Sequence, residues 1–321
     1  MKQHFFTVAK IAITVGLIAF AFSRVDLHEV RRSLAAANPW LVLLALAVYL
    51  LAIVINGVKW QVLLRALEVG APFRAVLQYM FVGFFFNSIL PANIGGDVMR
   101  GYGMARYTDR TAEAAVSVVV DRIVGLLAYM STAAVTAIVV VRLMNHAELQ
   151  WLFNLAVAAL LGIAVALAVM LSRRLRLQIG RIFQWGPLTR LAPTYDGLSG
   201  AFDAYRFHYR ALFHAYLLGL AGLMAANVVN WLLFEAVGGG VPFVDVMLFN
   251  PLIALVLMVP ISVGGHGVIQ NFYPFFYTLL GVPEIQAVAV SVLMSLVIIL
   301  GSLPGGLLWL RMRRAGEGVR G

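Results

Sequence analysis

Apolar residues occupy most of this chain in long runs that polar residues interrupt only at intervals. A run of about 20 apolar residues can cross the hydrocarbon core of a bilayer as a helix. The pattern therefore predicts about six full membrane-spanning helices. They are expected at residues 5–23, 39–58, 112–141, 151–171, 211–237 and 285–310. Pro39 and Trp40 open the second of them, which is typical of a helix that starts at the membrane interface.

Two further apolar segments, 72–108 and 243–283, are each broken near the middle by proline and glycine. One break reads P-A-N-I-G-G-D from Pro91, and the other reads P-I-S-V-G-G-H from Pro260. Their arms are short for a complete span, so each segment is predicted to be a re-entrant hairpin; two short complete spans are the alternative. Paired, interrupted segments in corresponding places point to a transporter-type binding site.

The recurrence of the broken segment predicts an all-α polytopic membrane protein with an inverted repeat. The predicted parts of this single transmembrane domain, 1–321, are the halves 39–141 and 211–310, the connecting helix 151–171, a cytoplasmic amphipathic segment at 188–210 and a surface helix at 61–71. The two hairpins are expected to enter from opposite faces of the membrane. Irregular backbone at membrane depth must be buried or line a wet cavity, so a polar cavity is predicted near the midplane.

Composition excludes an ordinary soluble domain and narrows the chemistry. The chain is 62% hydrophobic and 12% charged, whereas soluble domains are about 25% charged. Its lack of cysteine excludes disulfides, thiol catalysis and cysteine-ligated metals. No nucleotide-binding motif, metal-ligand spacing or nucleophile motif is present. We therefore expect no metal or other cofactor, and a protein that is not an enzyme.

The net charge of +10 comes from lysines and arginines in the loops between the predicted helices. Such loops face the cytoplasm in membrane proteins, so the charge predicts orientation rather than a nucleic-acid partner. The basic loop 172–181 and the arginines near the C-terminus place both termini on the cytoplasmic side of the cytoplasmic membrane. The loop containing Arg24, Arg31 and Arg32 is an exception, because this orientation of the predicted spans places it on the outer side of the membrane. The first apolar stretch has no cleavage site and is expected to remain as a helix.

Asp97 and Arg100 follow the first pair of glycines, Gly95 and Gly96. If a helix resumes there, the two charged side chains share one face and can pair. Backbone amides at glycines and at a helix N-terminus favour an anion such as phosphate, so all four residues are candidates for substrate binding. The alternative is that Asp97 only caps the helix.

Asp121 and Arg122 lie within the predicted span 112–141, where charged side chains are functional candidates. Adjacent helical residues point in different directions, so each needs its own partner. Substrate binding and a structural link between helices both remain open for this pair. Lys59 lies near the end of its span and is expected to extend its charged end to the interface.

The second break carries Gly264, Gly265 and His266, with the histidine in the place that Asp97 has in the first. His266 is a candidate for phosphate binding or for a charge change near neutral pH, and a hydrogen-bonded structural histidine is the alternative. Asn227 and Asn230 share a face of the fifth span. Amides in such positions often link helices; we expect that role for Asn227 and keep Asn230 among the substrate-binding candidates.

At these motifs the chain resembles the transmembrane, flippase-like domain of lysylphosphatidylglycerol synthases and its stand-alone relatives. The resemblance extends over about 10–310 and rests on the order and spacing of short motifs: the two breaks, Gly95-Gly96-Asp97 with Arg100, Asp121-Arg122 and Lys59-Trp60. It implies movement of a phospholipid between leaflets. In the synthases a separate soluble domain makes the aminoacylated lipid. Where that family often carries an Arg-Glu pair, this chain has Ile269 and Gln270.

The expected function is therefore a flippase for an anionic or aminoacylated phospholipid, with Arg100 and Arg122 holding the headgroup. Membrane lipids are the expected partners. A homo-oligomer and a separate lipid-modifying enzyme are further partners that the pattern leaves open. Two other functions also stay open. One is a membrane-embedded enzyme with His266 and Asp97 as acid and base, acting on a phospholipid or polyprenyl phosphate. The other is a non-catalytic partner of a lipid- or glycan-assembly complex.

Overall fold

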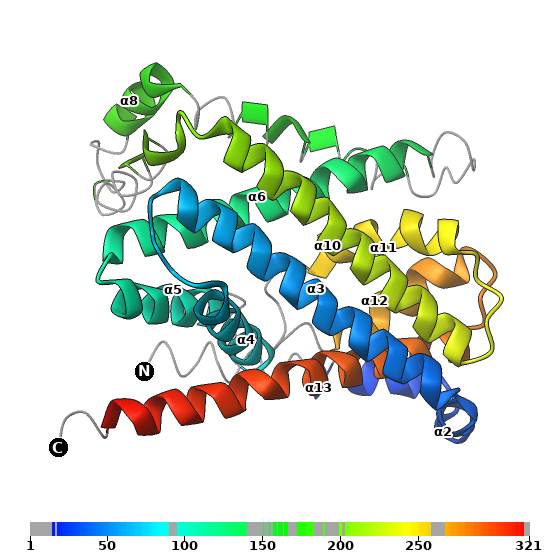
Figure 1. Cartoon of the computed structure of the whole chain (residues 1–321). Coiled ribbons are helices and arrows are strands. Elements are labelled where there is room, and N and C mark those ends of the chain that lie inside the picture. Colours follow the sequence, from blue (N-terminus) through cyan, green and yellow to red (C-terminus); the bar gives the residue numbers. More distant parts are fainter. Residues whose placement is uncertain are drawn as a thin grey trace. The chain divides into compact units, whose positions relative to one another are not determined.

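The protein is an all-α polytopic membrane protein (Figure 1). The structure is a computed structural model. It describes residues 15–16, 18–89, 95–139, 150, 154, 157–158, 160–162, 164–165, 172–182, 189, 199–200, 203–257 and 267–317. No strand occurs within these ranges. The predicted fold class is therefore confirmed.

Four helices in the described ranges are long and apolar enough to cross a membrane. They are α3 (Pro39–Ala66), α6 (Thr111–Ile138), α10 (Tyr209–Ala236) and α13 (Glu284–Glu317). Each begins within two residues of its predicted start, because a run of apolar residues sets the length of a spanning helix. The predicted spans 5–23 and 151–171 lie largely outside the described residues.

Both predicted broken segments consist of two helices (Figure 1). The first comprises α4 (Phe73–Ile89) and α5 (Gly95–Thr108), and the second comprises α11 (Phe243–Leu257) and α12 (Val268–Thr278). The breaks themselves, 90–94 and 258–266, lie outside the described residues. The helical arms are therefore confirmed, and entry and exit through one membrane face stay a prediction.

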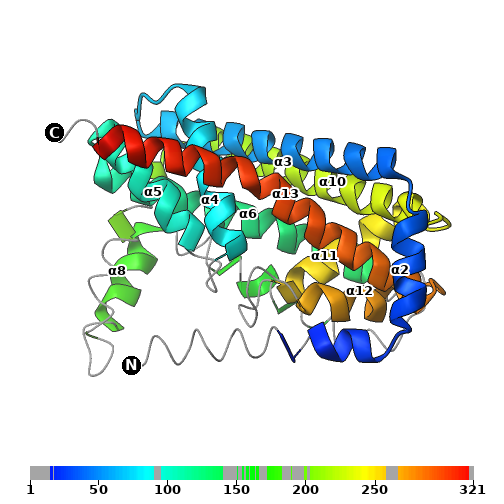
Figure 2. The ribbon, with the colours of Figure 1, turned by 90° about the horizontal axis from the view of Figure 1, so that it is seen from below.

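Close contacts divide the chain into two compact units. Unit 1 consists of Met1–Asn56, Leu77–Arg100 and Ala221–Gly321, and unit 2 consists of Gly57–Val76 and Gly101–Leu220. In unit 1, α13 packs against α12 and α2 (Leu27–Ala36), and α11 packs against α12 (Figure 2). The predicted repeat halves remain a prediction.

Unit 2 has a small core around Leu63 of α3 and Tyr205, with Val120 and Val124 of α6 and Ala215 of α10. The Tyr205 hydroxyl donates a hydrogen bond to the carbonyl oxygen of Leu63, at 2.8 Å. Burial, and secondarily the negative charge of Asp121, raise the pKa of Tyr205. The hydroxyl therefore stays protonated and keeps donating to α3.

Three local predictions are wrong. Residues 24–32 were expected to be loop, yet α2 begins there because the Asp26 side chain accepts a hydrogen bond from the His28 amide at 2.7 Å and caps it. The basic loop 172–181 is instead helix α8 (Arg173–Ile182), whose buried Arg176 pairs with Asp203.

The separate surface helix at 61–71 does not form, because α3 continues to Ala66 and buries Leu63 and Leu64. The segment 188–210 lies mostly outside the described residues.

Candidate functional site

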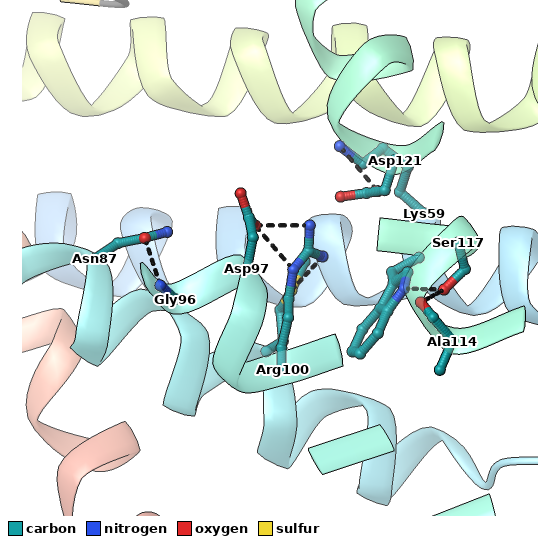
Figure 3. A network of polar contacts seen from close by, with 10 residues as sticks. Lys59, Asn87, Gly96, Asp97, Arg100, Ala114, Ser117 and Asp121 are labelled. Atoms are coloured by element: carbon teal, nitrogen blue, oxygen red, sulfur yellow. Dashed lines mark hydrogen bonds and ion pairs between the residues drawn. The ribbon is translucent and has the colours of Figure 1, made fainter. Parts of the chain in front are cut away.

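Asp97 and Arg100 form an ion pair in the first two turns of α5, directly after the first break (Figure 3). Both Nε and Nη2 of Arg100 lie 3.0 Å from Oδ1 of Asp97. The two side chains are 5% and 13% exposed. The predicted pairing at a spacing of three residues is confirmed, and it places a guanidinium group inside an apolar protein.

The guanidinium of Arg100 also contacts α4. Its Nη1 donates to the sulfur of Met80 at 3.4 Å. A thioether sulfur is a weak acceptor, so the oxygen of an anion would be a stronger partner for this guanidinium group. Five N–H donors in a planar fork match the oxygens of a carboxylate or a phosphate. The arrangement around Arg100 is therefore suited to an anionic group.

The glycines of the first break have a packing role. An added Cβ at Gly96 would lie 1.9 Å from the carbonyl oxygen of Gly83 on α4, so only glycine permits this close approach of α4 and α5. The Gly96 amide donates to Oδ1 of Asn87 at 2.9 Å (Figure 3). This amide, which the sequence analysis assigns to an anion, has an acceptor within the protein. Ligand contact by Gly95 and Gly96 stays a prediction.

A second ion pair lies within unit 2, where Nζ of Lys59 on α3 is 3.2 Å from Oδ1 of Asp121 on α6. Their side chains are 6% and 5% exposed. The expectation that Lys59 extends to the interface is wrong, because α3 continues beyond it and α6 offers a buried carboxylate. The lysine packs against Gly125 of α6, where an added Cβ would lie 3.4 Å from Nζ, an ordinary van der Waals distance.

The same two helices are joined by a second polar contact (Figure 3). Nε1 of Trp60 donates to Oγ of Ser117 at 3.0 Å, and Ser117 donates to the carbonyl oxygen of Ala114 at 2.8 Å. Asp121 is buried and Arg122 is exposed, which confirms that the adjacent charges point in different directions. Whether Asp121 or Arg122 contacts a substrate stays a prediction.

Buried amides connect the helices of unit 1. Asn250 of α11 donates to Oδ1 of Asn227 at 2.6 Å, and Nδ2 of Asn230 lies 3.3 Å from Oδ1 of Asn250. The hydroxyl of Tyr273 on α12 donates to Asn230. The expected helix-linking role of Asn227 is confirmed, and substrate contact by Asn230 stays a prediction. Asn250 is not among the residues singled out from the sequence, although an asparagine within an apolar arm is a usable signal.

The second break is described only from Gly267 onward, so Gly264, Gly265 and His266 lie outside the described residues. Gly267 has a φ of 82°, a conformation that favours glycine. Its amide donates to Oε1 of Gln270 at 2.6 Å, while Nε2 of Gln270 donates to Oγ of Ser295 on α13 at 2.8 Å. Gln270 therefore caps α12 and links it to α13. The hydrogen bond to Ser295 needs the amide of Gln270 as donor, because an ionised carboxylate has no N–H.

The described residues contain no group of three or more histidine, cysteine, aspartate or glutamate side chains that could hold a metal ion. Two ion pairs in the described part of the chain have both side chains largely buried, and one of these lies in each unit. An aspartate–arginine pair and an aspartate–lysine pair can bind, exchange or position charged groups.

Comparison with known proteins supports the resemblance seen in the motifs. The family model described as lysylphosphatidylglycerol synthase TM region matches residues 7–305. A UPF0104 membrane protein of Methanothermobacter thermautotrophicus is 23% identical over 302 residues, covering 88% of this chain and 89% of the relative. One of Pyrococcus horikoshii is 22% identical over 338 residues and covers 98% of both chains. The chain therefore belongs to the lysylphosphatidylglycerol synthase TM region family of multi-pass membrane proteins.

Proposed function

We propose that this protein moves a phospholipid with an anionic or aminoacylated headgroup between the leaflets of the cytoplasmic membrane. The observation that carries the proposal is the buried Asp97–Arg100 pair at the start of α5, directly after the broken part of the segment. Membership of a family named for a phospholipid-modifying synthase supports a lipid as the substrate.

The free-energy cost of placing a charge in the membrane explains why the Asp97–Arg100 pair is informative. An arginine at the centre of a membrane-spanning helix costs about 2.5 to 3.5 kcal/mol on insertion scales, so intramembrane charges commonly mark substrate pathways. Such a charge is tolerated when a partner or a polar cavity surrounds it. Arg100 and Asp97 meet that condition by pairing when no headgroup is bound.

The pair also suits the headgroup chemistry. A phosphate can replace the Asp97 carboxylate on the guanidinium of Arg100, because two parallel N–H donors fit two phosphate oxygens. Asp97 can then accept the ammonium group of an aminoacylated headgroup. With an aminoacylated headgroup, each protein charge exchanges one opposite charge for another, so neither is left buried alone. The acyl chains stay in the lipid while the headgroup crosses.

The remaining candidate residues take supporting parts in this proposal. Lys59 and Asp121 hold α3 against α6 and keep these two helices together. Arg122, Asn230 and the second break with Gly264, Gly265 and His266 are further proposed headgroup contacts. Both termini are proposed to face the cytoplasm. The chemistry is binding and release, so the protein acts as a transporter and not as an enzyme.

A transport assay tests this function. The purified chain is reconstituted in phosphatidylcholine vesicles containing trace phosphatidylglycerol with a fluorophore on an acyl chain. An impermeant quencher then reports lipid that reaches the outer leaflet. We expect wild-type vesicles to exceed protein-free vesicles and Arg100→Gln to slow movement by about tenfold or more, since a lost charged hydrogen bond is worth about 1.5 to 3 kcal/mol.

The matched control is Arg106→Gln, which removes the same charge from an exposed position on the same helix. It should leave the rate of lipid movement unchanged. Equal rates in wild-type and protein-free vesicles would contradict the proposal, as would equal slowing by both substitutions. Mass spectrometry of the recovered lipid distinguishes the alternatives, because a chemically altered lipid would indicate an enzyme.

A further inference from the structure

A basic pocket lies within unit 2, where α3 ends and α10 begins. The open cavity has a volume of about 650 Å³. Arg65 of α3 lines it together with Arg210 and His214 of α10, and His208 immediately precedes α10. No acidic side chain is among the described residues that line it. The pocket therefore concentrates positive charge contributed by two different helices.

The backbone at the start of α10 strengthens this preference for an anion. α10 begins at Tyr209. The backbone amides at the N-terminal end of a helix carry partial positive charge. Nδ1 of His208 lies 3.1 Å from the carbonyl oxygen of Ala204 and can donate to it. In the neutral ring that donates through Nδ1, Nε2 carries no proton and can only accept, so the donors for an anion come from the arginines and not from His208.

Aromatic residues beside the pocket indicate the source of the anion. Phe207 and Tyr209 line the pocket and are 73% and 67% exposed. The Arg206 guanidinium lies 4.5 Å from the centroid of the Phe207 ring. α3 and α10 are both candidate membrane spans, so their ends fall at the level of the headgroups. Exposed aromatic and basic side chains at that level are typical of contact with the bilayer interface.

We propose that this pocket binds the phosphate-bearing headgroup of an anionic phospholipid in the leaflet nearest this end of α3 and α10. Arg65 and Arg210 contact the phosphate from opposite helices, and Phe207 and Tyr209 contact the adjoining lipid. Basic pockets between membrane-spanning helices bind anionic headgroups in this way. The site does not include Arg100 and does not depend on lipid transport.

Lipid titration of the full chain tests the site. Purified protein in a neutral detergent is titrated with dioleoylphosphatidylglycerol, and bound lipid is counted by native mass spectrometry. The variant Arg65→Gln/Arg210→Gln should bind this lipid about 30-fold more weakly, because each arginine near an anionic surface contributes roughly fivefold. Binding of dioleoylphosphatidylcholine should change little. Each single substitution should give about a fivefold loss, which decides the question if the double variant does not fold.

The matched control is Arg74→Gln/Arg106→Gln, which removes two charges from exposed positions outside the pocket. It should bind phosphatidylglycerol as wild type does. An equal loss in the pocket and control variants would overturn the proposal, since only net charge would then matter. Displacement of the lipid by an equimolar amount of glycerol 3-phosphate would also overturn it, because a soluble phosphate would then be the ligand.

The Arg100→Gln variant separates this site from the transport function. It should lose lipid movement in vesicles and keep the Arg65-dependent part of phosphatidylglycerol binding. Loss of that binding component in Arg100→Gln would contradict a separate pocket. Conversely, a chain that binds phosphatidylglycerol through Arg65 and moves no lipid would overturn the transport proposal alone.

Discussion

The Asp97–Arg100 and Lys59–Asp121 ion pairs, both largely buried, differ in how they connect the chain. Asp97 and Arg100 lie three residues apart on α5, so their contact joins adjacent turns of one helix. Lys59 and Asp121 come from α3 and α6 and join segments far apart in the sequence. Opening a pair within one helix leaves the contacts between helices intact, whereas opening a pair between helices removes a link between them. The first is therefore suited to exchange partners, and the second to hold structure.

Asp121→Asn should have the largest effect on stability. It leaves the ammonium group of Lys59 buried without its carboxylate, and breaking a buried pair in this way costs about 3 to 5 kcal/mol. The free energy of unfolding in detergent–lipid micelles measures the loss.

The double variant Lys59→Met/Asp121→Leu provides the control for that measurement. It replaces both charges by apolar groups of similar volume and should recover most of the stability, since such replacements are often neutral. A double variant as unstable as Asp121→Asn would show that the charge interaction is not what matters at this position.

Gly96→Ala should have the next largest effect, because the added methyl group meets the Gly83 carbonyl oxygen at 1.9 Å. Forcing α4 from α5 should cost about 1 to 3 kcal/mol, as overpacking usually does. Gly70→Ala is the matched control, since nothing lies within 4 Å of its added Cβ. Similar free energies of unfolding for the two variants would argue against close helix packing at Gly96.

Asn250→Ala should have a smaller effect, since it removes one member of the amide cluster that links α10 and α11. Hydrogen bonds between membrane helices average about 0.6 kcal/mol and reach about 1.7 kcal/mol. Because Asn250 contacts both Asn227 and Asn230, we expect about 1 kcal/mol. The free energy of unfolding checks this value, and a loss as large as that of Asp121→Asn would contradict the ranking.

Arg100→Gln should change stability least and function most. Glutamine can still donate to Asp97, whose side chain is 13% exposed and keeps contact with water, so the free energy of unfolding should fall by about 1 kcal/mol or less. Lipid movement, measured in the same vesicles as above, should nevertheless fall about tenfold or more. If stability fell as much as in Asp121→Asn, the distinction between an exchangeable pair and a structural pair would be wrong.

Much of the fold follows from one-dimensional features of the sequence. The long apolar runs predict α3, α6, α10 and α13, because the thickness of the hydrocarbon core sets the length of a spanning helix. Proline and paired glycines predict where the broken segments stop and resume. The Asp97–Arg100 pair is also predictable, since a spacing of three residues brings side chains together on any helix.

Other features depended on contacts between distant segments. The chain determined that Lys59 and Asp121 are charged, but only the packing of α3 on α6 decided that they pair. Only the approach of α4 to α5 decided that Asn87 accepts the Gly96 amide. Helical period and span length describe a segment by itself, whereas the partner of a buried polar group comes from whichever helix the fold places beside it. The sequence alone therefore determined the long spanning helices of the described residues and their charges, and the tertiary structure decided which charges meet.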